Sequence, residues 1–394
     1  MLLDIYFGPD EFVREDMTIG GGGIGTLTSY LCPLLEELNF DVTVYQCSHK
    51  ARETVYGNSK IISMPVTPGP GRPTEGVVKH FRDIAYARSK TKQRIELFVA
   101  DFFSIKNDNP LSIAVQNGLA WDAPIELLTK KKIFHTPIGE RIFRYRWQLR
   151  GLERFENCHN RVAVDLYFLN WYRSFRGINL KGRVWYNPNP APVTNWDSER
   201  ESTINSGAPV RIIFARRFVP EKGTRLIAEV FKELLKLRPN ITITLAGSGP
   251  DKQFFGETFG SDSRVSIISY DVHDALIIHQ GHDISVTPSL CGEATCLSIL
   301  EAMSAGCAVV ATNLGGTITE IIDGFNGVLC WPAKDSLLEG IVNLIDRHDM
   351  RLRVQRLGWE TSQKAFSIDC WRDRWKDIIH KVLDGNAKTD STGY

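Results

Sequence analysis

The sequence predicts two doubly wound α/β domains that face each other across a cleft. Its 394 residues exceed what one ordinary hydrophobic core accommodates. Short apolar runs typical of strands alternate with helix-like runs in both halves of the chain. A proline-rich segment, residues 187–192, can continue neither kind of element and separates the two halves. We therefore expect two parallel sheets covered by helices, with the cleft at the carboxyl ends of their strands.

The first half is expected to begin with a strand at 2–7, a helix at 24–38 and a strand at 41–47. Further strands are predicted at 97–100, 112–115, 132–135, 161–164 and 183–186. An amphipathic helix is expected at 141–156.

The second half repeats this alternation, with a helix predicted at 224–237. Its strands are expected at 211–215, 241–246, 265–268, 284–286, 308–311 and 327–330. These elements suggest domains at 1–192 and 193–370. The polar tail, 387–394, is expected to be disordered.

The overall composition excludes several classes of protein. An apolar content of 43% and a charged content of 24% are typical of globular domains. A net charge of +1 gives no general attraction to nucleic acid, which is not an expected partner. The eight cysteines form no Cys-x-x-Cys pair, which favours reduced thiols and a cytoplasmic location over disulfides or zinc. No run of 18 apolar residues suggests a membrane span, and the first apolar run, interrupted by Asp4, suggests a strand rather than a signal peptide.

Two carboxylates, Glu293 and Glu301, bracket the start and body of an apolar helix that precedes a buried strand. Backbone N–H groups at a helix start attract a diphosphate, and carboxylates accept hydrogen bonds from sugar hydroxyls. A nucleotide sugar would satisfy both, with its hexose at one carboxylate and its ribose at the other. The alternative is an acid that stabilises the helix dipole together with an ordinary surface glutamate. The remainder of the chain favours the first interpretation.

A glycine-rich run, residues 20–25, opens the first predicted helix. Glycines allow the backbone to approach an anion closely. A dinucleotide-binding loop is disfavoured, because 12 residues, 8–19, separate the glycines from the first strand and Tyr45-Gln46 stands where an acid is expected. Judged alone, the glycines fit a flexible loop equally well.

Two cations, Arg217 and Lys222, lie between a predicted strand and a helix. At the cleft they could neutralise a leaving diphosphate in place of a metal ion. For the neighbouring Arg216 we expect a solvated charge. No Asp-x-Asp occurs, so the chain offers no obvious Mg²⁺ ligands and no metal site is predicted.

Together these motifs resemble those of retaining nucleotide-sugar glycosyltransferases of group 1, also called family 4. The matching blocks are residues 20–25, 217–223, 245–250 and 288–327, the last with Gly315-Gly316 and Asp323-Gly324-Phe325-Asn326-Gly327. The resemblance implies two Rossmann-like domains in the GT-B arrangement. It also implies that the last helix, 371–386, marked by Trp371 and Trp375, crosses back to the first domain.

The resemblance also implies roles for individual residues. Glu293 would bind hydroxyls of the donor hexose and Glu301 the ribose, while Arg217 and Lys222 would bind the diphosphate. The amides of Cys296 and Leu297 would hold phosphate. Other implied donor contacts are Gly23, Gly25, Gly247 and Thr295. The catalytic set would be Glu293, Arg217, Lys222 and Asn117.

Two departures from the family pattern concern the sugar. Ala294-Thr295 stands where the family often has Phe-Gly, which changes the shape beside the hexose. Asn117 stands where the family commonly has a histidine that hydrogen-bonds near the reacting sugar. Asn can form hydrogen bonds but does not titrate, and a purely structural turn residue before Gly118 is an equally good interpretation.

An acceptor site is suggested by Arg146, Arg150 and Arg154, which are spaced by four residues and form one basic stripe. The stripe could bind an anionic glycolipid at a membrane surface, or it could be a solvated helix face paired with neighbouring glutamates. Asp165 follows a strand and could face the acceptor, with a loop cap as the alternative.

The expected activity is metal-independent hexosyl transfer with retention, from a UDP-sugar to a glycan or glycolipid hydroxyl, without a cofactor. Lipopolysaccharide or surface polysaccharide synthesis at the inner face of the cytoplasmic membrane fits the family, with peripheral membrane contact. Two alternatives stay open: a nucleotide-sugar epimerase of the same architecture, and a non-catalytic nucleotide-sugar-binding protein.

Overall fold

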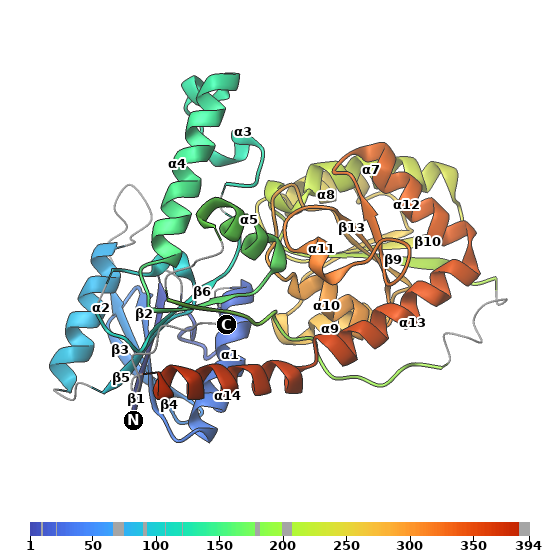
Figure 1. Cartoon of the computed structure of the whole chain (residues 1–394). Coiled ribbons are helices and arrows are strands. Elements are labelled where there is room, and N and C mark those ends of the chain that lie inside the picture. The colour runs from blue at the N-terminus through green and yellow to red at the C-terminus, as the bar shows by residue number, and fades with distance from the viewer. Residues whose placement is uncertain are drawn as a thin grey trace. The chain divides into compact units, whose positions relative to one another are not determined.

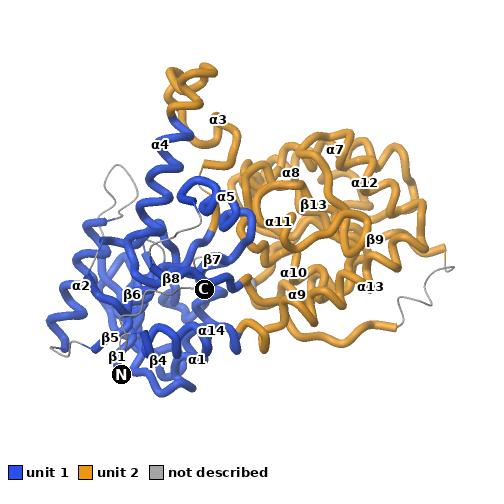
Figure 2. Tube along the Cα trace, in the orientation of Figure 1, with its two compact units in different colours: residues 1–117, 143–187, 372–394 blue, residues 118–142, 188–371 orange. Residues whose placement is uncertain are grey.

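A computed structural model describes residues 1–394 except 9, 10, 21, 66–74, 90–92, 107, 120, 178–181, 199–206 and 386–394. The chain divides into two compact units (Figure 2). Unit 1 contains residues 1–117, 143–187 and 372–394, and unit 2 contains residues 118–142 and 188–371. Each unit has a largely parallel sheet with helices, which confirms the predicted α/β fold class. The domain boundaries and the cleft stay predictions, and the predicted tail lies outside the described residues.

Unit 1 is built on an eight-stranded sheet in the order β3-β4-β2-β1-β5-β6-β7-β8 (Figure 1). Its strands are β1 (Leu2–Gly8), β2 (Asp41–Ser48), β3 (Arg52–Tyr56), β4 (Ser59–Pro65), β5 (Arg94–Phe98), β6 (Ser112–Gln116), β7 (Asn160–Ala163) and β8 (Arg183–Tyr186). Only the β3–β4 pair is antiparallel among these described strands. The strand order reverses direction between β1 and β5.

The helices of unit 1 include a last helix that returns to it. They are α1 (Gly22–Glu37), α2 (Glu75–Arg88), η1 (Asp101–Phe103), α5 (Leu166–Arg176), the main part of α4 (Pro137–Phe155), and α14 (Ile368–Asp384) from Arg372 onward. Arg372 and Lys376 on α14 both form ion pairs with Glu37 of α1. None of the described helices combines the length and apolar character needed to cross a bilayer.

Unit 2 has a six-stranded, wholly parallel sheet in the order β11-β10-β9-β12-β13-β14. Its strands are β9 (Val210–Ala215), β10 (Ile241–Ala246), β11 (Val265–Ile268), β12 (Ile284–Thr287), β13 (Ala308–Thr312) and β14 (Val328–Cys330). Its helices are η4 (Pro220–Lys222), α7 (Thr224–Leu237), α8 (Lys252–Phe259), η5 (Val272–Asp274), α9 (Ala275–Gln280), α10 (Leu297–Ser304), α11 (Thr317–Glu320), α12 (Lys334–Asp346) and α13 (His348–Ala365). Residues 118–142 add α3 (Ile125–Leu128), η2 (Lys132–His135) and the start of α4.

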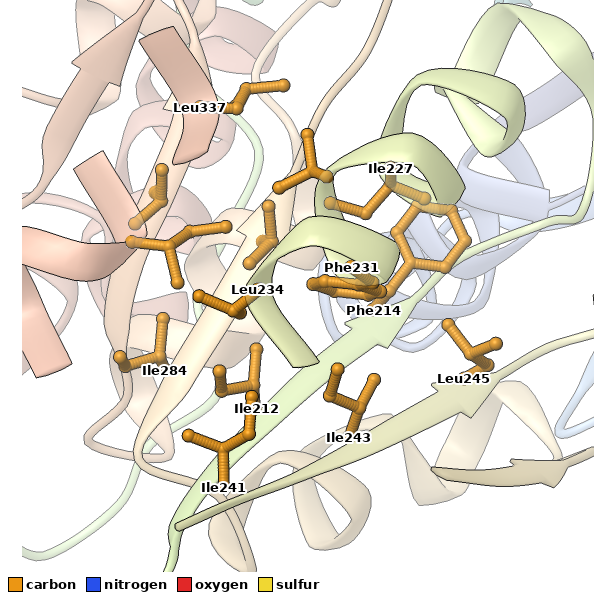
Figure 3. Packing of buried hydrophobic residues seen from close by; sticks show 14 of the residues in the cluster. Ile212, Phe214, Ile227, Phe231, Leu234, Ile241, Ile243, Leu245, Ile284 and Leu337 are labelled. Carbon is orange, nitrogen blue, oxygen red and sulfur yellow. The ribbon is translucent and has the colours of Figure 1, made fainter. Parts of the chain in front are cut away.

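The core of unit 2 forms where α7 packs on the sheet (Figure 3). Ile227, Phe231 and Leu234 are spaced by four and three residues, so they lie on one helical face. This face packs in the same fully buried cluster as Ile212 and Ile243 of the sheet. Burial of each such side chain contributes about 1.5–3 kcal/mol, which holds the sheet and its loops in place.

The predicted strand at 132–135 is wrong, because these residues form the 3₁₀ helix η2. Ile133 is 72% exposed, and Phe134 N–H donates to the carbonyl of Lys131 in a turn. This short apolar pair beside a run of lysines pairs with none of the described strands. The β3–β4 hairpin was not anticipated, since β3 alternates between exposed and half-buried positions at the sheet edge.

Strand β5 begins three residues before the predicted start at 97. Its charged residues Arg94 and Glu96 are fully buried. They are neutralised by ion pairs with Asp4 and Arg82, at 2.9 Å and 2.7 Å. A central strand that contains buried charges is only partly predicted by a search for apolar runs.

Candidate active site

The strand order of unit 2 reverses between β9 and β12, and ligands of open α/β sheets bind beside such a reversal at the carboxyl ends of the strands. Arg216 directly follows β9, and Ser289 and Glu293 follow β12. The topology therefore brings these three polar residues, far apart in sequence, to one edge of the sheet.

Glu293 is the centre of a nearly buried ionic cluster. Lys222 Nζ lies 2.7 Å and 2.9 Å from its two carboxylate oxygens, and Arg216 donates to Oε1 at 2.9 Å. Ser289 Oγ also donates to Oε1, while its own oxygen accepts from Arg216 at 2.8 Å. Side-chain exposure is only 12% for Glu293, 6% for Arg216 and 14% for Lys222. One carboxylate thus faces two cations in a poorly solvated site.

These partners decide the ionisation of Glu293. Burial acts to raise the pKa of this carboxyl, but the charges of Arg216 and Lys222 and the hydrogen bonds from Lys222 and Ser289 outweigh it. The pKa is therefore held well below its ordinary value. Glu293 is an anion at neutral pH and can only accept hydrogen bonds.

A tight turn carries Lys222 to this carboxylate. The 3₁₀ helix η4 ends at Lys222, and Gly223 adopts the left-handed conformation with φ +78°. A Cβ at Gly223 would lie 1.9 Å from the carbonyl oxygen of Pro288, so only glycine fits there. Leu290 N–H also donates to the carbonyl of Glu221 at 3.0 Å. The cation and the loop of the carboxylate are therefore packed together.

The backbone of Glu293 is fixed as well as its side chain. Glu293 forms a parallel β-bridge with Gly315, and Gly316 N–H donates to the Glu293 carbonyl at 2.6 Å. On the other side, Gly292 N–H donates to the carbonyl of Asp122 at 2.6 Å. The carboxylate is thus presented from an extended segment held on both sides.

Arg216 and Arg217 exchange the environments expected for them. Arg216, expected to be solvated, is 7% exposed and belongs to the Glu293 cluster. Arg217 is exposed, and among the described residues its guanidinium has no hydrogen bond or ion pair. The expectation for Arg216 is wrong, because the strand end turns the first arginine of the pair inward and leaves the second outside.

The start of α10 is already partly occupied within the protein. Cys296 N–H was predicted to donate a hydrogen bond to phosphate, but here it donates to Glu320 Oε2 at 2.9 Å. The carbonyl of Thr295 accepts from Asn189 Nδ2 at 2.9 Å. Leu297 is the first residue of α10. Sequence reasoning did not consider Glu320, whose distance from the motif gave no signal.

Glu301 lies on α10 in a different environment from Glu293. Burial raises the pKa of Glu301 to about 7, and the charge of Arg216 only partly opposes this. Burial, with a further contribution from the charge of Glu301, also raises the pKa of the Tyr270 hydroxyl, which places the two groups in electrostatic reach. Glu301 is therefore less fully ionised at neutral pH than an exposed glutamate.

Comparison with known proteins is informative about this unit. The family described as "Glycosyl transferases group 1" matches residues 195–358. The chain carries a group 1 glycosyltransferase domain. The resemblance expected from the sequence is thereby confirmed. The domain covers the Glu293 cluster, Glu301 and the glycines of the 315–316 pair.

Curated relatives of this glycosyltransferase domain align over part of their length. The lipopolysaccharide 1,2-N-acetylglucosaminetransferase of Salmonella typhimurium is 28% identical over 187 residues, covering 41% of this chain and 49% of the relative. One component of the human phosphatidylinositol N-acetylglucosaminyltransferase is 33% identical over 143 residues, covering 34% of this chain and 28% of the relative. The chain thus spans less than half the length of either relative.

Solved structures establish the fold over nearly the whole chain. Sucrose-phosphate synthase from Thermosynechococcus elongatus matches with a TM-score of 0.74 at 13% identity, covering 98% of this chain and 99% of that structure. WaaG, a glycosyltransferase involved in lipopolysaccharide biosynthesis, matches with a TM-score of 0.66 at 13% identity, covering 96% and 99%. The chain therefore has the GT-B type of fold, as predicted.

The remaining donor candidates are three glycines, one after a strand and two in the first helix. Gly247 follows β10, and its N–H donates to the carbonyl of Ile268 at 2.9 Å. In unit 1, Gly23 is exposed in the first turn of α1, and Gly25, two residues further along, is buried. A Cβ at Gly25 would lie 1.7 Å from the carbonyl oxygen of Gly20, so the loop requires glycine for packing whatever it binds.

Asn117 lies at the end of β6, next to a buried acid that sequence reasoning missed. Its side-chain N–H donates to the carbonyl of Val99, and its backbone N–H donates to Asp101. Burial raises the pKa of Asp101 to about 7, opposed by the charge of Arg154 and by backbone hydrogen bonds. The position of Asp101 after the apolar run of β5 was the available signal. The catalytic role of Asn117 stays a prediction.

The proposed acceptor residues differ strongly in exposure. Arg146 and Arg150 are exposed, but Arg154 is half-buried, with its guanidinium 5.8 Å from the centre of the Phe102 ring. Asp165 is fully buried and caps α5 by accepting from Phe168 N–H at 2.6 Å. The cap explains Asp165 by itself, and the single continuous stripe ends before Arg154.

Proposed function

We propose that this protein is a retaining hexosyltransferase that moves a sugar from a UDP-sugar to a hydroxyl of a glycan or glycolipid. The observation that carries the proposal is the buried Glu293 cluster at the strand-order reversal of a group 1 glycosyltransferase domain. An ionised carboxylate in a poorly solvated site suits the hydroxyls of a bound hexose, which must find an acceptor when they leave water. Retention is inferred from the family resemblance.

The cations would act on the other part of the donor. As the bond from the sugar to the diphosphate breaks, negative charge grows on the leaving diphosphate and positive charge on the sugar. Donor hydroxyls that bind Glu293 would compete with Lys222 for its oxygens and free the ammonium to turn toward the diphosphate. Arg217, which is exposed and lies five residues before Lys222, would add a second cation. Arg216 would stay on Glu293 and keep it ionised.

We propose further that transfer needs no divalent metal, because Lys222 and Arg217 supply the positive charge that a metal would supply. Activity should persist in EDTA. Complete loss in EDTA, with recovery on adding Mg²⁺ or Mn²⁺, would contradict this part of the proposal.

The names of two relatives support a proposal for the acceptor class. Their names include a lipopolysaccharide and a phosphatidylinositol transferase, both of which act on lipid-linked molecules by those names. We therefore propose a glycolipid acceptor, met at the inner face of the cytoplasmic membrane by a peripherally bound enzyme.

Two measurements test the proposal. Thermal-shift screening against nucleotide sugars should identify a stabilising UDP-sugar, since a ligand that binds only the folded state raises Tm. Donor turnover with that sugar should then require an added glycan or glycolipid acceptor. Release of a C2 epimer without any acceptor would instead establish an epimerase. Binding without turnover, with every acceptor class supplied, would indicate a non-catalytic protein.

A further inference from the structure

The beginning of α4 and the turn before it expose unusually large apolar side chains. Ile133 and Ile138 are each 72% exposed and Ile142 is 51% exposed. All three lie in the short segment 118–142, which contains α3, η2 and the first turns of α4 (Figure 1). An apolar cluster of this exposure is unusual for a water-facing surface and calls for a partner.

These side chains are presented by an ordered backbone. Gly139 N–H donates to Thr136 Oγ1 at 3.2 Å, and the ring of His135 hydrogen-bonds through Nε2 to the carbonyl of Thr129 at 2.9 Å. A Cβ at Gly139 would lie 2.1 Å from the carbonyl oxygen of Ile133, so η2 lies directly against the first turn of α4. The isoleucines are thus held outward by a defined turn.

On α4 the exposed apolar residues form one face with cations at both sides. Ile138, Ile142 and Tyr145 are spaced by four and three residues and fall within about 60° of the helix circumference. Arg141 and Arg146 fall about 60° to 80° to either side of Ile138. Tyr145 is 53% exposed, and both arginines are exposed.

The local charge is far from that of the whole chain. Residues 130–146 contain six Lys and Arg and one Glu, whereas the entire protein has a net charge of +1. Three of these cations, Lys130, Lys131 and Lys132, are consecutive and exposed beside Ile133. We call residues 130–146 the basic tip.

We infer that the basic tip docks on a bilayer surface that contains anionic lipids. Apolar side chains of one helix face would enter the boundary between headgroups and acyl chains, while the flanking cations contact lipid phosphates. A soluble anion would explain the cations but leave the isoleucines in water. An acidic protein partner would need a matching apolar groove, whereas a bilayer supplies both chemistries at once.

Only part of the predicted arginine stripe belongs to this surface. Arg146 belongs to the basic tip, but Arg154, the last member of the predicted stripe, is half-buried beside Phe102 and near Asp101. The surface therefore runs from Arg146 toward Ile133 rather than toward Arg154. Docking of the basic tip rests on the proposed function because it would bring the enzyme to a glycolipid acceptor. Lipid binding itself can be tested without sugar transfer.

Co-sedimentation of the full chain with sucrose-loaded vesicles tests the inference. Binding is expected to vesicles of equal parts phosphatidylcholine and phosphatidylglycerol, and to weaken when salt is raised. Ile138→Ser with Ile142→Ser, and separately Lys131→Glu with Lys132→Glu, should each lower the partition coefficient by about tenfold or more. Binding that is equally strong to phosphatidylcholine alone would overturn the inference.

Matched variants separate the tip from the general surface. Ile277 and Ile322 are 66% and 64% exposed in unit 2, and Lys79 and Lys232 are exposed cations elsewhere. The double variants Ile277→Ser with Ile322→Ser, and Lys79→Glu with Lys232→Glu, should bind like the parent. Equal losses in these controls and in the tip variants would overturn the inference.

Light scattering without vesicles tests whether a second copy of the chain binds the basic tip instead. A dimer that the Ile138 and Ile142 substitutions convert to a monomer would assign the surface to a second copy of the chain and overturn lipid docking. Donor turnover with a soluble acceptor should be unchanged in the tip variants. If the parent shows no donor turnover with any acceptor but still binds vesicles, the proposed function is refuted and the docking inference stands.

Discussion

Glu293 and Glu301 lie eight residues apart and flank the same helix start, yet the pKa values of their carboxyl groups are shifted in opposite directions. Arg216, Lys222 and Ser289 hold the pKa of Glu293 well below its ordinary value. Glu301 has burial without a direct ion pair to any described residue, and its pKa rises to about 7. Both residues are partly buried, and the difference comes from their partners.

The two carboxylates therefore differ in what they can do chemically. Glu293 is a permanent acceptor with fixed orientation, suited to the reacting end of a donor. Glu301 can both donate and accept near neutral pH, which suits a hydroxyl pair such as that of a ribose. Substitutions of either glutamate, or of the cations around Glu293, test this difference.

Glu293→Ala should have the largest effect, because it removes the acceptor and strands two cations. We expect a loss of turnover of on the order of 1–3 kcal/mol or more. We also expect a loss of folding free energy of about 3–5 kcal/mol, since Arg216 stays nearly buried without its carboxylate. Steady-state kinetics and urea unfolding measure the two. Glu229→Ala, at an exposed position on α7, is the control and should change neither; near-wild-type behaviour of Glu293→Ala would remove the basis of the proposed site.

Lys222→Ala should lower the maximal rate by about a hundredfold and the affinity for donor much less, because the leaving diphosphate gains charge in the transition state. Lys232→Ala serves as the matched control. A raised KM with an unchanged maximal rate would assign Lys222 to ground-state binding instead.

Arg216→Met should make Glu293 behave more like Glu301. Losing this cation raises the pKa of Glu293, so the acidic limb of the pH–rate profile moves to higher pH. Because a depressed folded pKa gives stability that is lost as pH falls through it, acid unfolding should also begin at higher pH. Arg216→Lys should restore part of both. A uniform drop in rate with an unmoved acidic limb would show that Arg216 does not act through Glu293.

Glu301→Gln should give the smallest effect, visible in stability against pH. The raised pKa means that the folded parent loses stability as pH rises from the ordinary value of 4.5 to about 7. A neutral amide escapes this loss, so the variant should gain about 1–2 kcal/mol relative to the parent at pH 8 but not at pH 4. Nucleotide affinity should fall at the same time. Parallel stability curves for parent and variant would contradict the assigned pKa.

Much of the fold was accessible from the sequence, because most strands are continuous apolar runs and α7 has a clear helical period. Strand β5 was partly hidden by two buried charges whose partners, Asp4 and Arg82, lie far away in sequence. The residues at 132–135 resemble a strand locally, and only their place in the folded turn against Gly139 decides otherwise.

The candidate site was predictable in content but not in pairing. The sequence supplies Glu293, Lys222 and two adjacent arginines. Arg216 is buried and Arg217 is exposed, and this choice is made only in the assembled sheet. The pairing of Lys222 with Glu293 likewise depends on the left-handed turn at Gly223, which closes against Pro288 only in the folded unit.

The hydrogen bond from Gly292 N–H to the carbonyl of Asp122 links the segment that carries the start of the basic tip to the residue before Glu293. An amide exchanges its hydrogen with solvent only when such a bond opens. The deuterium uptake of Gly292 therefore records how firmly residues 118–142 are held on the Glu293 loop. Following it with and without vesicles would show whether vesicle binding changes how firmly the Glu293 loop is held.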